Sequence, residues 1–121
     1  MLRDATGFSK IYIACGYTDL RCGINTLTVM IQDKFHLDTC QKNVLFLFCG
    51  RRTDRIKGLL WEGDGWLLLY KRLENRNDHF QWPRTTSEAL LISERQLRLL
   101  MDGFSVYGTI NEVFEPPKYR L

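Results

Sequence analysis

The sequence lacks most of the features that indicate a membrane protein or a protein of an oxidising compartment. It contains no apolar run near the roughly 20 residues that a membrane-spanning helix needs. The N-terminal residues alternate in polarity, which is typical of a strand rather than a secretory signal. Its four cysteines form no CxxC pair and no zinc-finger spacing. We therefore expect a cytoplasmic protein with reduced thiols and no membrane partner.

Signatures of catalysis are also missing. The chain has two histidines, no Ser/His/Asp motif, no phosphate-cradling glycine loop and no cluster of metal ligands. One nuclease reading remains, in which Asp54 and Glu62 hold Mg²⁺ and Lys57 assists the attacking water. The usual spacing of acids and lysine on one strand is absent, and Asp54 falls on the opposite strand face from Lys57. We expect a protein without catalysis or cofactor, with a metal-dependent nuclease as the less favoured alternative.

Charge is present but unevenly placed. In 121 residues, 45% hydrophobic and 26% charged, the net charge is only +3, which does not by itself indicate nucleic-acid binding. Between residues 51 and 84, however, eight basic residues stand against five acidic ones, so this segment accounts for the whole excess. The excess positive charge of the chain is therefore assigned to its middle third.

Hydrophobic periodicity and turn residues predict a single α+β domain over residues 1–104, followed by a loosely attached tail over 105–121. We expect an antiparallel or mixed sheet with a long central hairpin, together with two to three helices. The predicted strands are Lys10–Cys15, Val44–Phe48, Arg55–Trp61, Trp66–Leu73, His79–Trp82 and Ala89–Ile92.

Two helices are predicted from their start signals and apolar spacing. The first begins at Leu20, with Thr18 or Asp19 as the N-cap, and ends near Lys34–His36. The second begins at a capping box formed by Ser93 and Gln96 and ends at residues 102–103.

The two strands joined by the turn Glu62-Gly63-Asp64-Gly65 present different faces, because side chains alternate along a strand. One face is aliphatic and should lie on the core: Ile56, Gly58, Leu60, Leu67, Leu69, Lys71 and Leu73. The other face collects Arg55, Lys57, Leu59, Trp61, Trp66, Leu68, Tyr70 and Arg72. Val44–Phe48 is apolar on both faces, which indicates a central strand.

Cations that reach phosphates, interleaved with aromatic rings that stack on sugars or bases, are typical of a nucleic-acid surface. Trp61 and Trp66 have an alternative role, as a cross-strand pair that covers a second small core. Both interpretations are open at this stage. The candidate DNA- or partner-binding residues are Arg51, Arg52, Arg55, Lys57, Trp61, Trp66, Tyr70, Lys71, Arg72 and Arg21.

Four stretches together resemble a known family. They read ACGYTDLRCGINTL (14–27), LFLFCGRRTDRIKGLLWEGDGWLLLYKRLE (45–74), FQWP (80–83) and LISERQLRLLMDGF (91–104). In this order and at these separations, they resemble the small accessory proteins of the insertion sequence 66 family of bacterial transposons. These are TnpB-type products of the second open reading frame, distinct from the RNA-guided nucleases that share that label. Cys22 stands where the family usually has a basic residue.

The resemblance implies a role in DNA transposition beside a separate, larger transposase that carries the catalytic carboxylates. It implies binding of transposon-end DNA by the basic and aromatic hairpin face. As the alternative, it implies a protein-interaction module that docks on the transposase or self-associates as a homo-oligomer. In both alternatives the binding surface lies on the hairpin.

Overall fold

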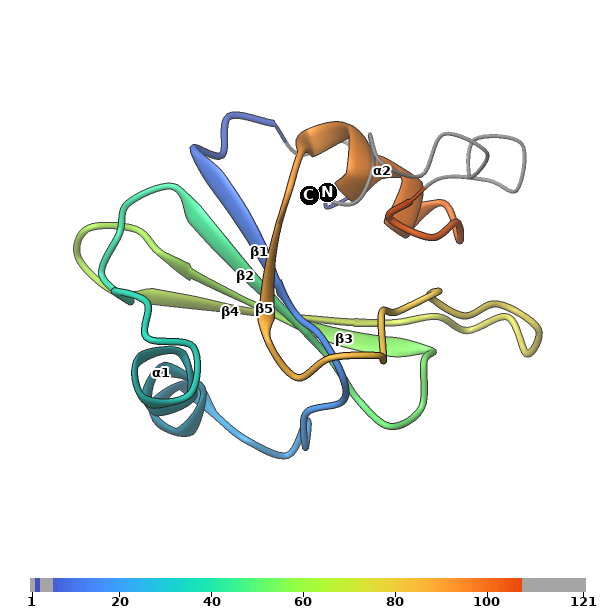
Figure 1. Ribbon diagram of the computed structural model, residues 1–121, viewed down its shortest axis with the longest axis horizontal. Helices are drawn as coiled ribbons and strands as arrows, with labels where there is room; N and C mark the ends of the chain where they lie inside the picture. The colour runs from blue at the N-terminus through green and yellow to red at the C-terminus, as the bar shows by residue number, and fades with distance from the viewer. Residues whose placement is uncertain (1, 3–5, 108–121) are drawn as a thin grey trace.

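A five-stranded mixed sheet forms the middle layer of the molecule, with the strand order β4-β3-β2-β1-β5 (Figure 1). The computed structural model describes residue 2 and residues 6–107. Its elements are β1 (Lys10–Ala14), α1 (Ile24–Asp33), β2 (Val44–Cys49), β3 (Arg55–Trp61), β4 (Trp66–Arg72), β5 (Ala89–Ile92) and α2 (Glu94–Met101). The predicted α+β class with a mixed sheet is confirmed.

Strand β2 is central, as its apolar sequence predicts, and all six of its residues are buried. It pairs in parallel with β1, and α1 makes the crossover that a parallel pair requires. The other pairings, β1–β5, β2–β3 and β3–β4, are antiparallel. The β3–β4 hairpin lies at one edge of the sheet rather than at its centre, because β4 is an edge strand.

The two helices cover opposite faces of the sheet (Figure 1). Leu27 and Ile31 of α1 are fully buried against Phe46, Phe48 and their neighbours. On the other face, Leu97 and Leu100 of α2 pack with the inward side chains of β1, β2 and β3. The result is a three-layer molecule in which each helix contributes an apolar stripe with helical spacing.

Helix α1 begins four residues later than the sequence predicts. Gly23 is the N-cap, and neither Thr18 nor Asp19 caps the helix. The Asp19 carboxylate instead accepts from the backbone N–H of Arg21, while the Thr18 N–H donates to the Cys49 carbonyl oxygen. Because both groups are engaged in the loop, the chain stays non-helical through Cys22.

The predicted strand His79–Trp82 is wrong, although its alternation is real. Phe80 and Trp82 are buried and Gln81 is exposed. The segment has no strand partner: its Phe80 N–H donates to Thr53 in a loop, and the Trp82 indole donates to the Ala14 carbonyl oxygen at 2.8 Å. An extended segment laid over the core therefore produced the strand-like pattern.

The capping box that starts α2 is confirmed, with Ser93 and Gln96 bonded reciprocally. Gln96 also donates to the Val106 carbonyl oxygen, and Val106 is buried in the core. The packed part of the domain therefore reaches at least Val106, beyond the predicted boundary at residue 104. The remainder of the predicted tail, from residue 108, lies outside the described residues. Among the described residues, no helix combines the length and apolar composition that crossing a membrane requires.

Candidate nucleic-acid interface

An open cleft of about 710 Å³ lies beyond the carboxyl ends of β1 and β2. Carboxyl ends of parallel strands are the common position of ligand sites in sheets of this kind. The β1–α1 loop, the β2–β3 loop with the start of β3, and β4 meet here, and we call the site the cationic cleft. It is lined by Tyr17, Thr18, Asp19, Leu20, Arg21, Gly50, Arg51, Arg52, Arg55, Lys57 and Tyr70.

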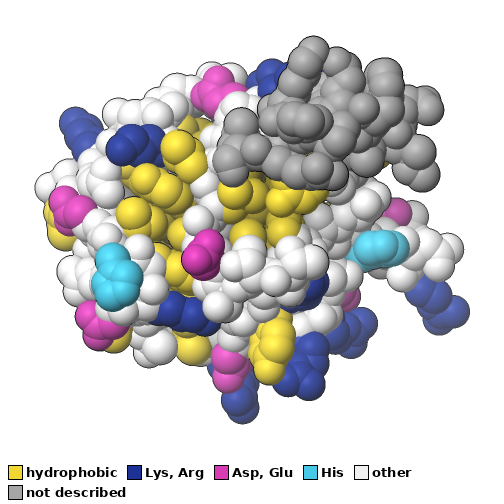
Figure 2. Space-filling model, in the orientation of Figure 1, with side chains coloured by type: hydrophobic (Ala, Val, Ile, Leu, Met, Phe, Trp, Pro, Cys, Tyr) yellow, Lys and Arg dark blue, Asp and Glu magenta, His cyan; other side chains and the backbone are white. Residues whose placement is uncertain are grey.

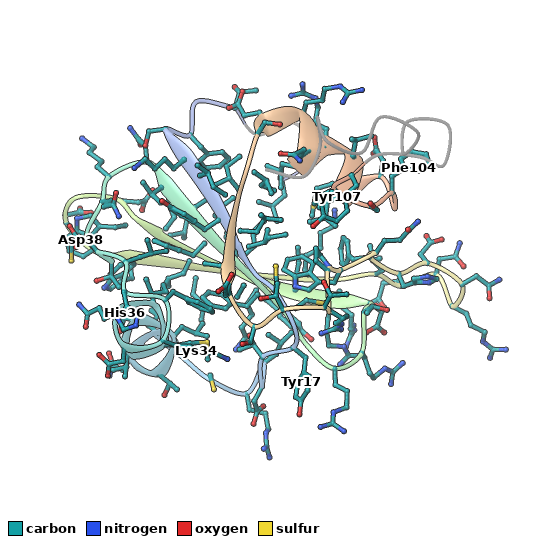
Figure 3. The ribbon with its side chains drawn as sticks, viewed as in Figure 1. Tyr17, Lys34, His36, Asp38, Phe104 and Tyr107 are labelled. Atoms are coloured by element: carbon teal, nitrogen blue, oxygen red, sulfur yellow. The ribbon has the colours of Figure 1, made fainter. Side chains whose placement is uncertain are left out.

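The lining is strongly unbalanced in charge. Five of the residues are cationic and one, Asp19, is anionic. Figure 3 places Tyr17 at the lower margin of the molecule, with its side chain directed away from the sheet. Figure 2, in the same orientation, shows Lys and Arg side chains gathered along this margin. The cleft therefore offers a local positive field that the modest net charge of the chain conceals.

Arg51 is held in place by an aromatic ring. Its guanidinium lies 4.6 Å from the centroid of the Tyr17 ring and donates a 2.9 Å hydrogen bond to the Tyr17 hydroxyl. The contact joins the β1–α1 loop to the β2–β3 loop. Because a phenol carries no opposing charge, Arg51 keeps its full positive charge for a ligand.

Asp19 and Arg21 form a local pair at the rim. The Arg21 guanidinium donates to both Asp19 carboxylate oxygens, at 3.0 and 2.7 Å, and these bonds lower the pKa of Asp19 to about 2. The Arg21 side chain remains 91% exposed. Asp19 therefore orders the loop, while leaving the outer donors of Arg21 open to solvent.

Lys57 and Tyr70 lie opposite each other in the β3–β4 register. The Lys57 ammonium donates a 2.8 Å hydrogen bond to the Cys22 carbonyl oxygen, just before α1. Tyr70 is 52% exposed. The register confirms the predicted alternation, in which Arg55, Lys57, Tyr70 and Arg72 share one face of the hairpin.

Asp54 lies between two guanidiniums. Arg55 donates to it at 2.8 Å and Arg52 at 3.3 Å, and the hydrogen bond from Arg55 lowers the pKa of Asp54. Glu62 directly follows the far end of β3, roughly 26 Å away at the usual rise of a strand. The three residues of the nuclease hypothesis are therefore not gathered into one site.

Arg84 is a positioning residue that the sequence did not single out. Its guanidinium donates to the carbonyl oxygens of Gly16 at 2.6 Å and Gly50 at 2.7 Å. These glycines directly precede Tyr17 and Arg51. Arg84 thus ties together the two loops whose side chains stack in the cationic cleft. The only sequence signal was an arginine directly after the Trp82-Pro83 pair.

Six of the ten predicted binding residues line the cationic cleft: Arg21, Arg51, Arg52, Arg55, Lys57 and Tyr70. Arg72 lies beside Arg55 in the register and bonds to Glu74 at 2.8 Å. Lys71 lies on the opposite sheet face, among the residues around His79 and Phe80. Tyr17, which is not among the ten predicted residues, joins the site because β1 and β2 are parallel neighbours.

Trp61 and Trp66 lie at the turn end of the hairpin, away from the cationic cleft. Their ring centroids are 5.0 Å apart and the rings are tilted by 59°. Between them and the cleft, Leu59 is fully buried beneath α1, and Trp66 and Leu68 pack on the same cluster. The basic and aromatic face is therefore divided in two, and Trp66 has the core-covering role that the alternative interpretation gave it.

The chain is similar to known proteins over nearly all of this structure. The profile of the family described as "IS66 Orf2 like protein" matches residues 9–109. The chain is 36% identical over 109 residues to protein y4hO of Sinorhizobium fredii (strain NBRC 101917 / NGR234), covering 90% of this chain and 91% of that protein. It is 30% identical over 94 residues to protein y4jC of the same strain, covering 78% of each. Both relatives carry the description "uncharacterized".

No solved structure matches the chain. The family match includes every residue of the cationic cleft, the β3–β4 hairpin and α2. The resemblance drawn from the TDLR, GRRTDRIK and YKRLE stretches is thereby confirmed. The chain belongs to the IS66 Orf2-like proteins, the accessory proteins of insertion sequence 66 elements, a family that points to an accessory role in transposition.

Proposed function

We propose that this accessory protein binds transposon DNA by holding its phosphates in the cationic cleft. The observation that carries the proposal is the convergence of five cationic side chains, one from the β1–α1 loop and four from residues 51–57, on one open site with a single carboxylate among its lining residues. A stable fold does not need such a cluster, because like charges repel. An anionic ligand would relieve this repulsion.

The pairing within the cleft leaves arginine donors available for phosphate. Asp19 and Asp54 fix Arg21, Arg52 and Arg55 without covering all of their donors. A guanidinium held in this way can present a second edge to a phosphate, in the bidentate geometry that arginine favours. Because Asp19 and Asp54 already order these arginine side chains, the side chains lose less conformational entropy when DNA binds.

Salt dependence of DNA binding tests the proposal. The protein would be titrated into labelled terminal-repeat DNA of its element at several salt concentrations. If about four phosphates are neutralised, log K should fall against log salt with a slope of about −3.6 for a duplex. Binding that does not respond to salt, or an absence of binding at micromolar protein, would overturn it.

Docking on the transposase, or self-association, is the second candidate function, and the Trp61 side chain favours it. Trp61 is half-buried and lies at the tip of the hairpin, where it contacts Trp66. Aromatic side chains of this kind are frequent anchors of protein interfaces. Trp61→Ala is the suitable variant, since Trp66 also packs on the core. Loss of transposase capture with DNA binding intact would assign docking to this end of the hairpin.

A further inference from the structure

The cationic cleft is recessed, and its cations are graded in depth. The Arg52 and Arg21 side chains at its rim are 76% and 91% exposed, whereas the Arg55 side chain on β3 is 29% exposed. A protein usually reads a duplex by inserting a protruding helix or ribbon into the major groove. The inner cations here lie in a hollow instead. A flexible single strand can enter this hollow more readily than the sugar-phosphate backbone of a rigid duplex can.

Two exposed tyrosines flank these cations. Tyr17 is 57% exposed and Tyr70 is 52% exposed, from the β1–α1 loop and from β4 respectively. Both are among the large hydrophobic side chains that the structure leaves most exposed, and both line the cleft. Exposed aromatic rings beside a basic groove are the usual platform for unstacked bases, which a duplex keeps inside its stack.

The volume of the cleft agrees with such a ligand. About 710 Å³ lies within the range of roughly 300–1,000 Å³ for sites that enclose a small organic molecule. That size suits individual nucleotides. The Arg51 guanidinium, already stacked on Tyr17, extends the flat surface against which a base can lie.

From the recess, the two exposed rings and the fixed Arg51, we infer that the cationic cleft binds an unpaired stretch of DNA. Tyr17 and Tyr70 stack on its bases, while Arg55 and Lys57 hold its phosphates. The inference rests on the proposed function, and it narrows the ligand from DNA in general to single-stranded DNA. Single strands arise at transposon ends whenever a strand is cleaved or displaced.

The test compares one terminal-repeat sequence in two forms by fluorescence anisotropy. Each labelled strand alone and the duplex of both strands are titrated at the same salt concentration. We expect the single strands to bind at least roughly tenfold more tightly than the duplex. Tyr17→Leu and Tyr70→Leu should each weaken single-strand binding by about five- to 150-fold. Duplex binding should fall by less than about twofold in Tyr70→Leu and by about two- to fivefold in Tyr17→Leu, because Tyr17→Leu also removes the ring and hydroxyl that hold Arg51.

Tyr70→Phe keeps its ring and should bind single strands within about twofold of the unsubstituted protein. Tyr17→Phe keeps its ring but lacks the hydroxyl that accepts from Arg51, so it should restore only part of the binding that Tyr17→Leu loses. Both tyrosines are more than half exposed, so the leucine variants should fold. Equal or tighter binding of the duplex, with a normal salt slope, would overturn this inference and leave the proposed function standing. Absence of binding to both forms would overturn the two together.

Discussion

The Arg51 guanidinium lies over the Tyr17 ring, 4.6 Å from its centroid, and donates a hydrogen bond to its hydroxyl at 2.9 Å. This contact connects two loops that are more than 30 residues apart in the sequence. It places a cation on the rim of the cationic cleft without neutralising it.

The contribution of Arg51 to DNA binding should depend on Tyr17. In a double-mutant cycle of Arg51→Ala and Tyr17→Ala, the combined loss of binding free energy should be smaller than the sum of the two single losses. The expected coupling is about 0.5–1 kcal/mol, the usual value for an exposed cation–π contact. Additive losses would show that Tyr17 does not position Arg51.

Arg84 should affect both stability and binding, although it lies behind the loops. Arg84→Gln removes the charge-assisted bonds to Gly16 and Gly50, and we expect it to lower the free energy of unfolding by about 1–2 kcal/mol. DNA affinity should fall as well, because the Tyr17 and Arg51 loops are no longer tied. Urea unfolding measures the first effect and DNA titration the second. Arg76→Gln, in an exposed turn, is the matched control and should change neither.

The Asp19–Arg21 pair should make the free energy of unfolding depend on pH in the acid range. Because its bonds lower the pKa of Asp19 to about 2, against about 3.9 for an unpaired carboxyl, ionised Asp19 stabilises the fold above about pH 4. This stabilisation is lost as the pH falls from about 4 toward 2. The difference in urea midpoint between the unsubstituted protein and Asp19→Asn should therefore shrink over that interval. When Arg21 is replaced by Gln, the difference in urea midpoint between the forms with and without Asp19→Asn should be small at every pH. If Arg21→Gln leaves this difference in urea midpoint unchanged, the Asp19–Arg21 pairing is contradicted.

The reactivity of the cysteine thiols should show whether the strands beneath the cationic cleft are buried. Burial raises the pKa of Cys49 to about 11 and also raises the pKa of Cys15, so both thiols should be protonated and shielded at pH 8. Cys40 is exposed. We expect a thiol reagent to modify Cys40 in the folded protein and to reach Cys15 and Cys49 only after unfolding, as mass spectrometry of modified peptides can show. Rapid modification of Cys49 in the folded state would contradict the buried strand β2.

Local patterns in the sequence were sufficient for much of the fold. The alternation of the hairpin predicted which residues share a face, and the Ser93 capping box predicted the start of α2. The start of α1 was missed because Asp19 makes a turn with Arg21 instead of a cap, and both uses of an aspartate look alike in a sequence. The extended segment at Phe80 looked like a strand because burial alternates along any extended chain.

The cationic cleft was only partly predictable. Arg51, Arg52, Arg55 and Lys57 stand together in the sequence, so their clustering was visible. Tyr17 and Arg84 enter the site through the parallel pairing of β1 with β2 and through long-range bonds to backbone carbonyls, neither of which leaves a local pattern. Conversely, burial of Leu59 under α1 separated Trp66 from the basic residues, and only the packing of the helix shows this.

The central claim, that the position of the cations rather than the net charge binds DNA, is tested most directly by two charge-matched double variants. Arg51→Ala/Arg52→Ala removes two cations from the cationic cleft, whereas Lys10→Ala/Lys71→Ala removes two from the amino end of β1 and the opposite sheet face. Both lower the net charge from +3 by the same amount. We predict that the cleft variant loses at least roughly tenfold in affinity and that its salt slope becomes smaller by about 1.8, while the other variant keeps both values. Equal losses in the two variants would contradict the account.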